Sequence, residues 1–395
     1  MKIESRIGAS IYLLSILNII SMGFMFILGT HVSNIVYVFS FFVSIYLIKV
    51  SNHKFSLISY LVLIFVICII AYSMLIRALD LTGYGQLNSL DLVSRVLVYL
   101  RGILITIIFL SLFKIDKDKC IKGINDAVCL TVICSLILLI PFIFGNVLPL
   151  NFYRSFIGVG TLTGFTGLFH NPNYWSMFIL VSLVFLLRSF SMGKCNSLHV
   201  ISIVGCLLNL VFSGSRMALV CLATILVVYV ICYVKLSIKH LISMIFFIML
   251  SLIFIKEVNF DEFLMFEKIT DRTLRMFEHI ESEPRYMLMM DYMTAVLKNP
   301  LLGIGLDNFF SFLVPHNNIV TTLVEFGFLG VCFIFGGFFM IAYRAMRADE
   351  KFVAISLFVL MIMISLMNDL YDVRATWLAL GWLTYQSNLF LIKRF

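Results

Sequence analysis

Long apolar runs recur along the chain, and each is about as long as a helix that crosses a lipid bilayer. A membrane-spanning helix needs about 20 mostly apolar residues, and twelve stretches approach or exceed this length. We predict helices at 7–28, 32–50, 55–76, 91–113, 123–145, 173–190, 198–213, 216–234, 240–256, 316–343, 352–367 and 375–392. The seventh is the weakest, because Gly205, Asn209 and Ser213 interrupt it. The pattern predicts an all-α polytopic membrane protein with about twelve transmembrane helices.

Composition and loop charge agree with this pattern and give it an orientation. Hydrophobic residues make up 62% of the 395 residues and charged residues 13%, which leaves too few polar side chains to cover a water-soluble globule. The short loops of one side carry 17 lysines and arginines, whereas those opposite carry only Arg77, Arg154, Arg216 and Arg374. By the positive-inside rule, we predict that the basic loops and both termini are cytoplasmic. The net charge of +8 then reflects membrane anchoring, and we predict no binding to nucleic acid.

One segment departs from the pattern of short loops. Residues 256–315 contain ten acidic and six basic residues and lie on the predicted outer side. Within this segment, PRYMLMMDYMTAVLKNP (284–300) predicts an amphipathic helix on the membrane surface, ended by Asn-Pro. We therefore predict three parts: 1–255 with spans 1 to 9, 256–315 outside the membrane, and 316–395 with spans 10 to 12. The GIG sequence at 303–305 predicts no more than a tight turn.

Polar residues gather at the predicted outer ends of the even-numbered spans. Asn171 and Asn173 open the sixth span, Arg216 the eighth, His316 with Asn317 the tenth, and Arg374 the twelfth. A helix amino end has free N–H groups and a partial positive charge, so a cation in its first turn calls for an anion nearby. Arg285, which follows Pro284, is a second cation of this kind. If these ends converge, they form a cavity suited to a phosphate or diphosphate group.

Each of these residues also has an ordinary structural explanation. Asn171 and Asn173 are as suited to helix capping as to ligand binding. An arginine at the membrane interface often anchors a lipid head group. Arg374 is flanked by Asp369 and Asp372, which are its expected ion-pair partners.

Two charged residues lie deep within predicted spans. Arg101 and Glu325 each lie about ten residues from the outer end of their span. An unpaired charge at such depth costs at least ~2.5–3.5 kcal/mol, so we predict that the two form a pair or share a polar network. Arg95 lies nearer the outer surface and is a candidate to face a phosphate group.

Four motifs resemble those of the O-antigen polymerase and O-antigen ligase superfamily. They are GLFHNPNYWSM (167–177), GSRMAL (214–219), EPRYMLMMDYM (283–293) and PHNNIVTTLVEFGFLG (315–330). The last contains His-Asn, nine residues, Gly, two residues and Gly, here His316, Asn317, Gly327 and Gly330. The motifs follow the family's order, and the resemblance covers about residues 160–345. It implies a multi-helix membrane glycosyltransferase at the outer leaflet of the bacterial plasma (inner) membrane, with no cofactor and no metal.

The resemblance also implies roles for individual residues. His316 would take the proton of an acceptor hydroxyl or orient that hydroxyl. Arg216 and Arg285 would hold the diphosphate of an undecaprenyl-diphosphate-linked glycan. Asn317 and Asn171 would fix the histidine tautomer or bind sugar hydroxyls. Beyond this glycan and membrane lipids, the expected partners are a chain-length regulator and a flippase of the same pathway.

The superfamily contains two activities that share this chemistry. A polymerase adds repeat units of O-antigen or capsule to one another, and a ligase transfers the finished chain to lipid A-core of lipopolysaccharide. Only ten residues separate Gly305 from His316, where ligases often have a longer loop, and this favours a polymerase.

Two other classes of protein remain open. A secondary transporter or polysaccharide flippase would explain the number of spans and the charges within them. It would leave the single outer segment and the ordered Arg, Arg and His motifs unexplained. A scaffold in a polysaccharide machine would need no catalytic residue.

Overall fold

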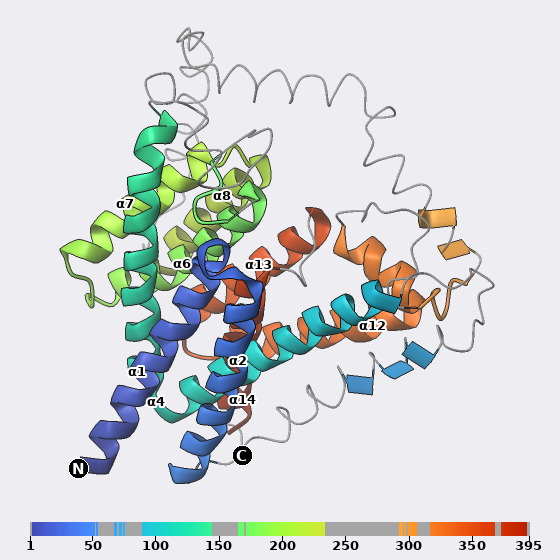
Figure 1. The fold of residues 1–395 in the computed structure, drawn as a ribbon, viewed down its shortest axis with the longest axis horizontal. Coiled ribbons are helices and arrows are strands. Elements are labelled where there is room, and N and C mark those ends of the chain that lie inside the picture. Colours follow the sequence, from blue (N-terminus) through green and yellow to red (C-terminus); the bar gives the residue numbers. More distant parts are fainter. Residues whose placement is uncertain are drawn as a thin grey trace, which may run out of the picture.

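In the computed structural model, most of the described residues are helical, and none of them lies in a β-strand (Figure 1). The described residues are 2–51, 53, 67–68, 71–72, 74–75, 89–143, 165–169, 171–233, 292–294, 296–297, 299–305, 317–367 and 373–392. Most of predicted span 55–76, all of span 240–256 and residues 256–291 of the outer segment lie outside them. Within the described part, the predicted all-α class is confirmed.

The described helices follow the predicted spans, except that the first boundary lies at Phe24, so residues 25–28 of the predicted first span belong to α2. They are α1 (Lys2–Gly23), α2 (Met25–Val50), α4 (Ser89–Ile143), α6 (Pro172–Ser191), α7 (Ser197–Phe212), α8 (Arg216–Tyr233), α12 (Asn318–Met346), α13 (Lys351–Met367) and α14 (Arg374–Ile392). Non-helical backbone at Asp116 divides α4 into two arms, which correspond to predicted spans 91–113 and 123–145. The weakly predicted seventh span is helix α7. Five of the described helices are long and apolar enough to cross a membrane, and α7 and α8 are among the shorter apolar ones.

Helix α2 is apolar on its outer surface and polar toward the protein. Ile35, Phe39 and Phe42 are exposed at helical spacing, whereas Ser40 and Ser44 are fully buried. A water-soluble protein rarely exposes so continuous an apolar stripe. A helix in lipid gains nothing by burying its apolar side chains, and small polar residues favour close packing between such helices. The distribution is that of a helix whose outer face contacts lipid.

Helix α14 packs along the first arm of α4, and both run in the same direction. The indole of Trp377 covers Gly102, where an added Cβ would lie 2.0 Å from the ring. Further along, Trp382 is fully buried with its ring 4.8 Å from that of Phe113. This register places Arg374, at the start of α14, near the level of Tyr99 on α4.

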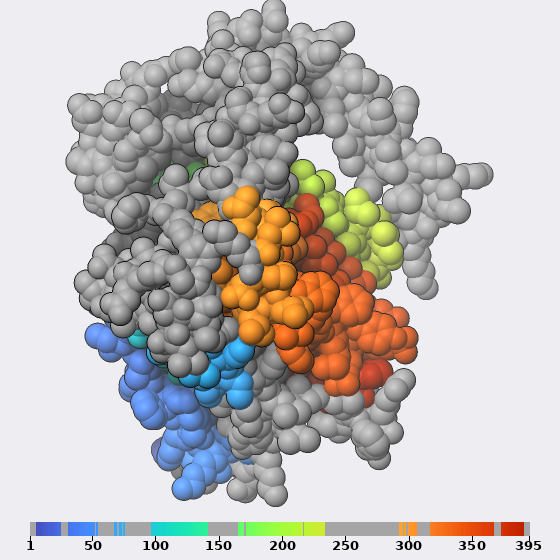
Figure 2. Space-filling view, turned by 90° about the vertical axis from the view of Figure 1, so that its right-hand side faces the viewer, coloured from blue at the N-terminus to red at the C-terminus, as the bar shows by residue number. Residues whose placement is uncertain are grey.

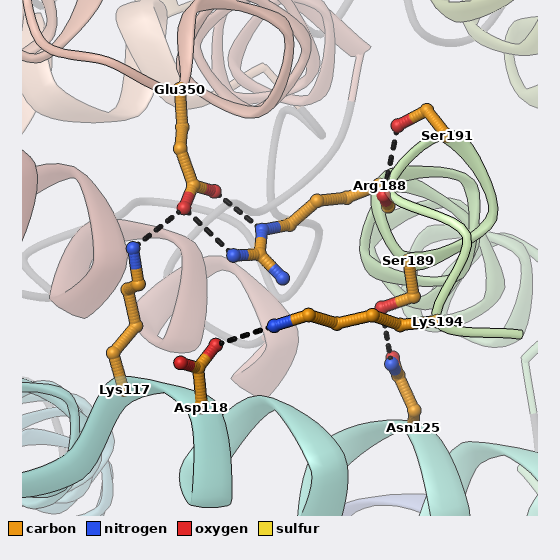
Figure 3. A network of polar contacts seen from close by, with 8 residues as sticks. All are labelled: Lys117, Asp118, Asn125, Arg188, Ser189, Ser191, Lys194 and Glu350. Atoms are coloured by element: carbon orange, nitrogen blue, oxygen red, sulfur yellow. Dashed lines mark hydrogen bonds and ion pairs between the residues drawn. The ribbon is translucent and has the colours of Figure 1, made fainter.

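A network of charged side chains joins α4, α6 and the start of α13 (Figure 3). The carboxylate of Glu350 accepts hydrogen bonds from both Nε and Nη2 of Arg188, the latter at 2.7 Å, and from Lys117 Nζ at 2.9 Å. Arg188 is almost fully buried, and its guanidinium lies 5.8 Å from the ring centre of Trp382. The network therefore contains a buried ion pair at one end of the bundle.

Contacts between helices agree with the predicted alternation of sides. Lys117, Arg188 and Glu350, which meet in this network, were all predicted on the cytoplasmic side. Trp175 and Asn209, both predicted near the opposite side, are joined by a hydrogen bond of 3.0 Å. The structure thus groups the residues as the topology requires, and the assignment of one group to the cytoplasm stays a prediction.

Candidate functional site

The Asn-Pro-Asn motif forms the amino end of α6. Asn171 is the N-cap residue, and its side-chain oxygen accepts a hydrogen bond of 2.8 Å from the backbone N–H of Asn173. Pro172 occupies the first helical position, where its missing N–H costs no hydrogen bond. The capping alternative considered for Asn171 is thus present, and it occupies the side-chain oxygen. The proposed binding role of this residue is not tested by this geometry.

The segment before α6 folds back over the first turn of that helix. Gly167 has φ of +56° and lies against the ring of Trp175, where a Cβ would be 2.0 Å from the indole. The N–H of Phe165 donates to the carbonyl of Phe212, the last residue of α7, at 2.8 Å. The Trp175 indole also bonds Asn209 of the same helix. These contacts hold the start of α6 beside the turn that leads into α8.

That turn carries the first arginine motif. Gly214 has φ of +63°, and α8 begins at Arg216, which is therefore in the first turn, as predicted. The N–H of Ala218 donates to Ser215 Oγ at 3.4 Å, and the N–H of Leu219 to the Ser215 carbonyl at 3.2 Å. The Asn-Pro-Asn and Gly-Ser-Arg motifs consequently share one end of the helix bundle. The side chains of Arg216 and Arg95 lie outside the described residues.

The two asparagines that follow His316 have different surroundings. Asn317 is the N-cap of α12, and its side-chain oxygen accepts from the N–H groups of Ile319 and Val320 at 3.1 and 3.2 Å. Asn318 is fully buried, and neither its side-chain oxygen nor its nitrogen has a hydrogen-bond partner among the described residues. Sequence analysis selected Asn317 and missed Asn318, because burial of the second amide has no local signal. His316 itself lies outside the described residues.

Helix α12 is broken at Gly327, where φ is +65° and ψ is −171°. In a continuous helix, the carbonyls of Val324 and Glu325 would accept from the N–H groups four residues later. Here those carbonyls accept from Ile304 and Gly305 of another segment, at 2.8 and 3.1 Å.

The N–H groups beyond the break are satisfied by the same segment. The N–H of Phe328 donates to the carbonyl of Pro300 at 2.8 Å, and the N–H of Leu329 to that of Leu301 at 3.3 Å. Residues 300–305 therefore replace two helical hydrogen bonds with four inter-segment bonds. Because a lost backbone hydrogen bond is costly in a membrane protein, this pairing explains how the break is tolerated.

The GIG sequence is therefore more than a tight turn, and that prediction was wrong. A Cβ on Gly303 would lie 2.5 Å from the backbone nitrogen of Gly327, and a Cβ on Gly327 would lie 2.3 Å from the carbonyl oxygen of Leu301. Figure 2 shows the light-orange residues of this segment lying against the darker orange of α12. A Cβ on Gly330 would meet the Phe326 side chain at 2.1 Å. Both glycines of the His-Asn motif are thus sites of close approach at the break.

The end of the second arginine motif packs on the same piece of α12. Tyr292, Val296 and Ile304 form a small core with Val320 and Val324. Of the predicted helix 284–300, residues 292–294 and 296–297 are helical, and Asn299 and Pro300 are not. The face predicted to contact the membrane is exposed at Met293 and Leu297. This core brings the Glu-Pro-Arg and His-Asn motifs together, although Arg285 lies outside the described residues.

Glu325 lies at the end of the amino-terminal piece of α12 and is fully buried. Tyr99 of α4 donates its hydroxyl hydrogen to Glu325 Oε2 at 3.2 Å, and the Tyr99 ring meets the Phe326 ring edge to face. Arg101, two residues along α4, is half-buried. Glu325 therefore has a polar contact with the predicted fourth span, made by Tyr99. Direct pairing of Arg101 with Glu325 stays a prediction.

Arg374 is the first residue of α14 and is buried. Its Nη1 donates to the hydroxyl of Tyr37 at 3.2 Å, and its guanidinium lies 5.3 Å from the centre of the Tyr37 ring. The expected partners Asp369 and Asp372 lie outside the described residues. The structure therefore adds Tyr37, on α2, as a contact that the sequence did not indicate.

Comparison with known proteins gives one family match. Residues 201–335 match a family model described as O-antigen ligase. No curated protein matches the sequence. The matched range begins within α7 and ends within α12, so it contains both arginine motifs, the segment 300–305 and the break at Gly327. The match over residues 201–335 supports the resemblance of this chain to the O-antigen polymerase and ligase superfamily.

Proposed function

We propose that the protein is a glycosyltransferase that moves a glycan from an undecaprenyl-diphosphate carrier to a sugar hydroxyl at the outer leaflet of the bacterial plasma membrane. The observation that carries this proposal is the assembly of the four motifs into two pairs at helix amino ends. Phe165 with Phe212 joins the Asn-Pro-Asn and Gly-Ser-Arg motifs. Tyr292 with Val320 joins the Glu-Pro-Arg and His-Asn motifs.

The backbone arrangement at each pair suits an anionic leaving group. Helix α8 begins at Arg216, directly after Ser215. Helix α12 begins at Asn318, two residues after His316. Their amino ends carry partial positive charge and favour an anion such as a diphosphate. We assign Arg216 and Arg285 to the diphosphate, because an arginine fork matches phosphate oxygens and neutralises the charge that develops on departure. Arg95 is assigned to the outer phosphate group of the donor.

The acceptor side is assigned to the start of α12. His316 takes the proton from the acceptor hydroxyl as the hydroxyl oxygen attacks the anomeric carbon, and the bond from that carbon to the diphosphate breaks. Asn317 holds the helix start in place through its cap hydrogen bonds. Asn318 has an uncommitted amide among the described residues and is assigned to a sugar hydroxyl. A metal-independent reaction remains part of the proposal.

Among the two activities of the family, we propose repeat-unit polymerisation, with ligation to lipid A-core as the alternative. The residues on either side of 306–316, the stretch that contains His316, are held by hydrogen bonds. Gly305 is bonded to Glu325 at one end of the amino-terminal piece of α12, and Asn317 caps the other. A loop this short leaves little room for a large acceptor-binding insertion, and this favours an acceptor delivered on the same kind of lipid carrier.

Purified protein in lipid nanodiscs with a lipid-linked oligosaccharide tests the proposal. Wild type should lengthen the glycan, and His316→Ala should abolish lengthening while retaining the melting temperature. Full activity of His316→Ala would remove this residue from the mechanism. No transfer by wild type, together with movement of the lipid-linked glycan across a vesicle membrane, would support the transporter alternative instead.

The products of a deletion strain separate the two activities. Surface glycan that carries single repeat units indicates a lost polymerase. Bare lipid A-core, with long chains accumulating on the carrier lipid, indicates a lost ligase.

A further inference from the structure

Two buried arginines of this protein each lie over an aromatic ring and differ in what one edge of the guanidinium binds. Arg188 and Arg374 are 2% and 4% exposed. The first lies over the ring of Trp382 and the second over that of Tyr37. On Arg188, the edge formed by Nε and Nη2 binds both carboxylate oxygens of Glu350. On Arg374, Nε and Nη2 have no hydrogen-bond partner among the described residues.

This edge is the part of a guanidinium that recognises oxyanions. Nε and Nη2 donate two parallel hydrogen bonds, whose spacing fits two oxygens of a carboxylate or phosphate group. The remaining nitrogen, Nη1, is already bonded to the Tyr37 hydroxyl at 3.2 Å. Arg374 is thus held in one orientation, with its bidentate edge uncommitted within the described part of the chain.

The position of Arg374 makes the demand for an anion stronger. It is the first residue of α14, a helix of 19 residues, and its charge lies at the positive end of the helix dipole. A buried cation in this place is disfavoured twice, by loss of water and by the dipole. An anion bound to the edge would compensate both, and the free N–H groups of the first helical turn would add to its binding.

We propose that the Nε and Nη2 edge of Arg374 binds a phosphate group of a membrane lipid. The start of α14 is on the predicted outer side, where lipid phosphates lie in a bilayer. Two lipids supply this chemistry, a polyprenyl diphosphate and an anionic phospholipid. The first case names a further contact for the donor and rests on the proposed function, whereas phosphate binding as such is independent of glycan transfer.

The test compares lipid-dependent stabilisation of variants purified into phosphatidylcholine nanodiscs. Undecaprenyl diphosphate or phosphatidylglycerol is added to each, and the change in melting temperature is followed as a function of lipid concentration. Because two charge-assisted hydrogen bonds are lost, Arg374→Gln should weaken binding of the active lipid about 10- to 100-fold. Arg374→Lys keeps the positive charge but lacks the two parallel N–H donors of a guanidinium, so it should weaken lipid binding less than Arg374→Gln does. If only undecaprenyl diphosphate stabilises the protein, the bound phosphate belongs to the carrier lipid. If phosphatidylglycerol stabilises the protein as much as undecaprenyl diphosphate does, the bound phosphate belongs to a phospholipid.

Matched variants separate this inference from its rivals. Arg347→Gln removes an exposed arginine that also lies over a tyrosine ring, 4.6 Å from the centre of Tyr343, and should leave lipid binding unchanged. Equal lipid binding by wild type, Arg374→Gln and Arg374→Lys would overturn the proposal. The double variant Asp369→Asn, Asp372→Asn would then show whether these two carboxylates bind the Nε and Nη2 edge of Arg374. If Arg374→Gln is not recovered folded, Arg374→Lys decides. The same measurement on His316→Ala distinguishes the two proposals, because it should lose transfer and keep Arg374-dependent binding.

Discussion

Gly303 and Gly327 lie so close together that a Cβ on either would be 2.5 Å from the backbone nitrogen of the other. Gly303 belongs to segment 300–305, and Gly327 breaks α12. Four hydrogen bonds between residues 300–305 and the flanks of the break surround this contact. The spacing of the His-Asn motif follows from this geometry. Asn317 caps a short helical piece, nine residues complete it, and Gly327 ends it.

Replacing Gly327 by alanine should prevent correct folding. The new Cβ would lie 2.3 Å from the carbonyl oxygen of Leu301, and the residue would have to keep φ at +65°. Because backbone on both sides is fixed by hydrogen bonds, we expect a loss above ~4 kcal/mol, seen as aggregation in size-exclusion chromatography. Gly336→Ala is the control, since nothing lies within 4 Å of its Cβ position in the same helix. A monodisperse Gly327→Ala protein with the wild-type melting temperature would contradict the structural account of the motif.

The helices and their caps were largely predictable from local pattern, and the break was not. Apolar runs of sufficient length indicated α1, α2 and both arms of α4, and asparagine before a run indicated the cap at Asn171. The break depends on residues 300–305, which satisfy backbone groups that lie 20 to 28 positions later in the chain. No local pattern reports such a partner. The motif glycines were visible in the sequence, but their physical cause required the tertiary structure.

The same limit applies to the charged residues. Arg188 was counted among the basic anchors of the cytoplasmic loops, although it is buried and paired with Glu350, 162 positions away. Asn318 could not be separated from Asn317 by type, since both are asparagines at a helix start. Burial distinguishes them, and burial is set by neighbours from distant parts of the chain.

The two asparagines after His316 should respond differently to mutation. Asn317→Ala removes the cap hydrogen bonds to Ile319 and Val320 and should cost ~0.5–2 kcal/mol of stability. Asn317→Asp should recover most of that loss, because aspartate is an equally good cap. Asn318→Ala breaks no hydrogen bond among the described residues, so it should leave the melting temperature unchanged and reduce glycan transfer. If Asn318→Ala lowered stability and left transfer at the wild-type rate, its assignment to a sugar hydroxyl would be wrong.

The contact of Tyr99 with Glu325 should stabilise the amino-terminal piece of α12. Tyr99→Phe removes the hydroxyl that donates to Oε2 at 3.2 Å and keeps the ring that packs on Phe326. A hydrogen bond to a charged group contributes ~1.5–3 kcal/mol, and this is the loss we expect in the free energy of unfolding. The unfolding of nanodisc-embedded protein by denaturant or heat provides the measurement.

A double-mutant cycle tests the predicted pairing of Arg101 with Glu325. If the two charges interact, Arg101→Gln and Glu325→Gln together should cost less than the sum of the single changes, with a coupling of ~0.5–3 kcal/mol. Additive effects of the two substitutions would show that each charge is satisfied separately. Tyr99→Phe combined with Glu325→Gln serves as the comparison, because the Tyr99 hydroxyl contacts Glu325 in the structure.

The ion pair of Arg188 with Glu350 should make stability depend on pH at the acid end. Burial alone raises the pKa of the Glu350 carboxyl, but the hydrogen bonds and charges of Arg188 and Lys117 outweigh burial and lower it below its ordinary value. A carboxyl with a lowered pKa in the folded state binds its proton less readily when folded. Its contribution to stability is therefore complete above the unfolded pKa, about 4.3, and is lost as the pH falls through the folded value.

Glu350→Gln should remove this dependence along with the pair itself. Because it leaves Arg188 buried without its carboxylate, we expect a loss of ~3–5 kcal/mol at neutral pH and a flatter acid limb in the melting temperature. Asp118→Asn is the matched control. Its partner Lys194 lies at 3.2 Å, but both side chains are more than half exposed, so the cost should stay below ~1 kcal/mol. Equal costs for the two variants would mean that water screens the Glu350 pair as it screens the exposed one, and that this pair does not hold α4, α6 and α13 together.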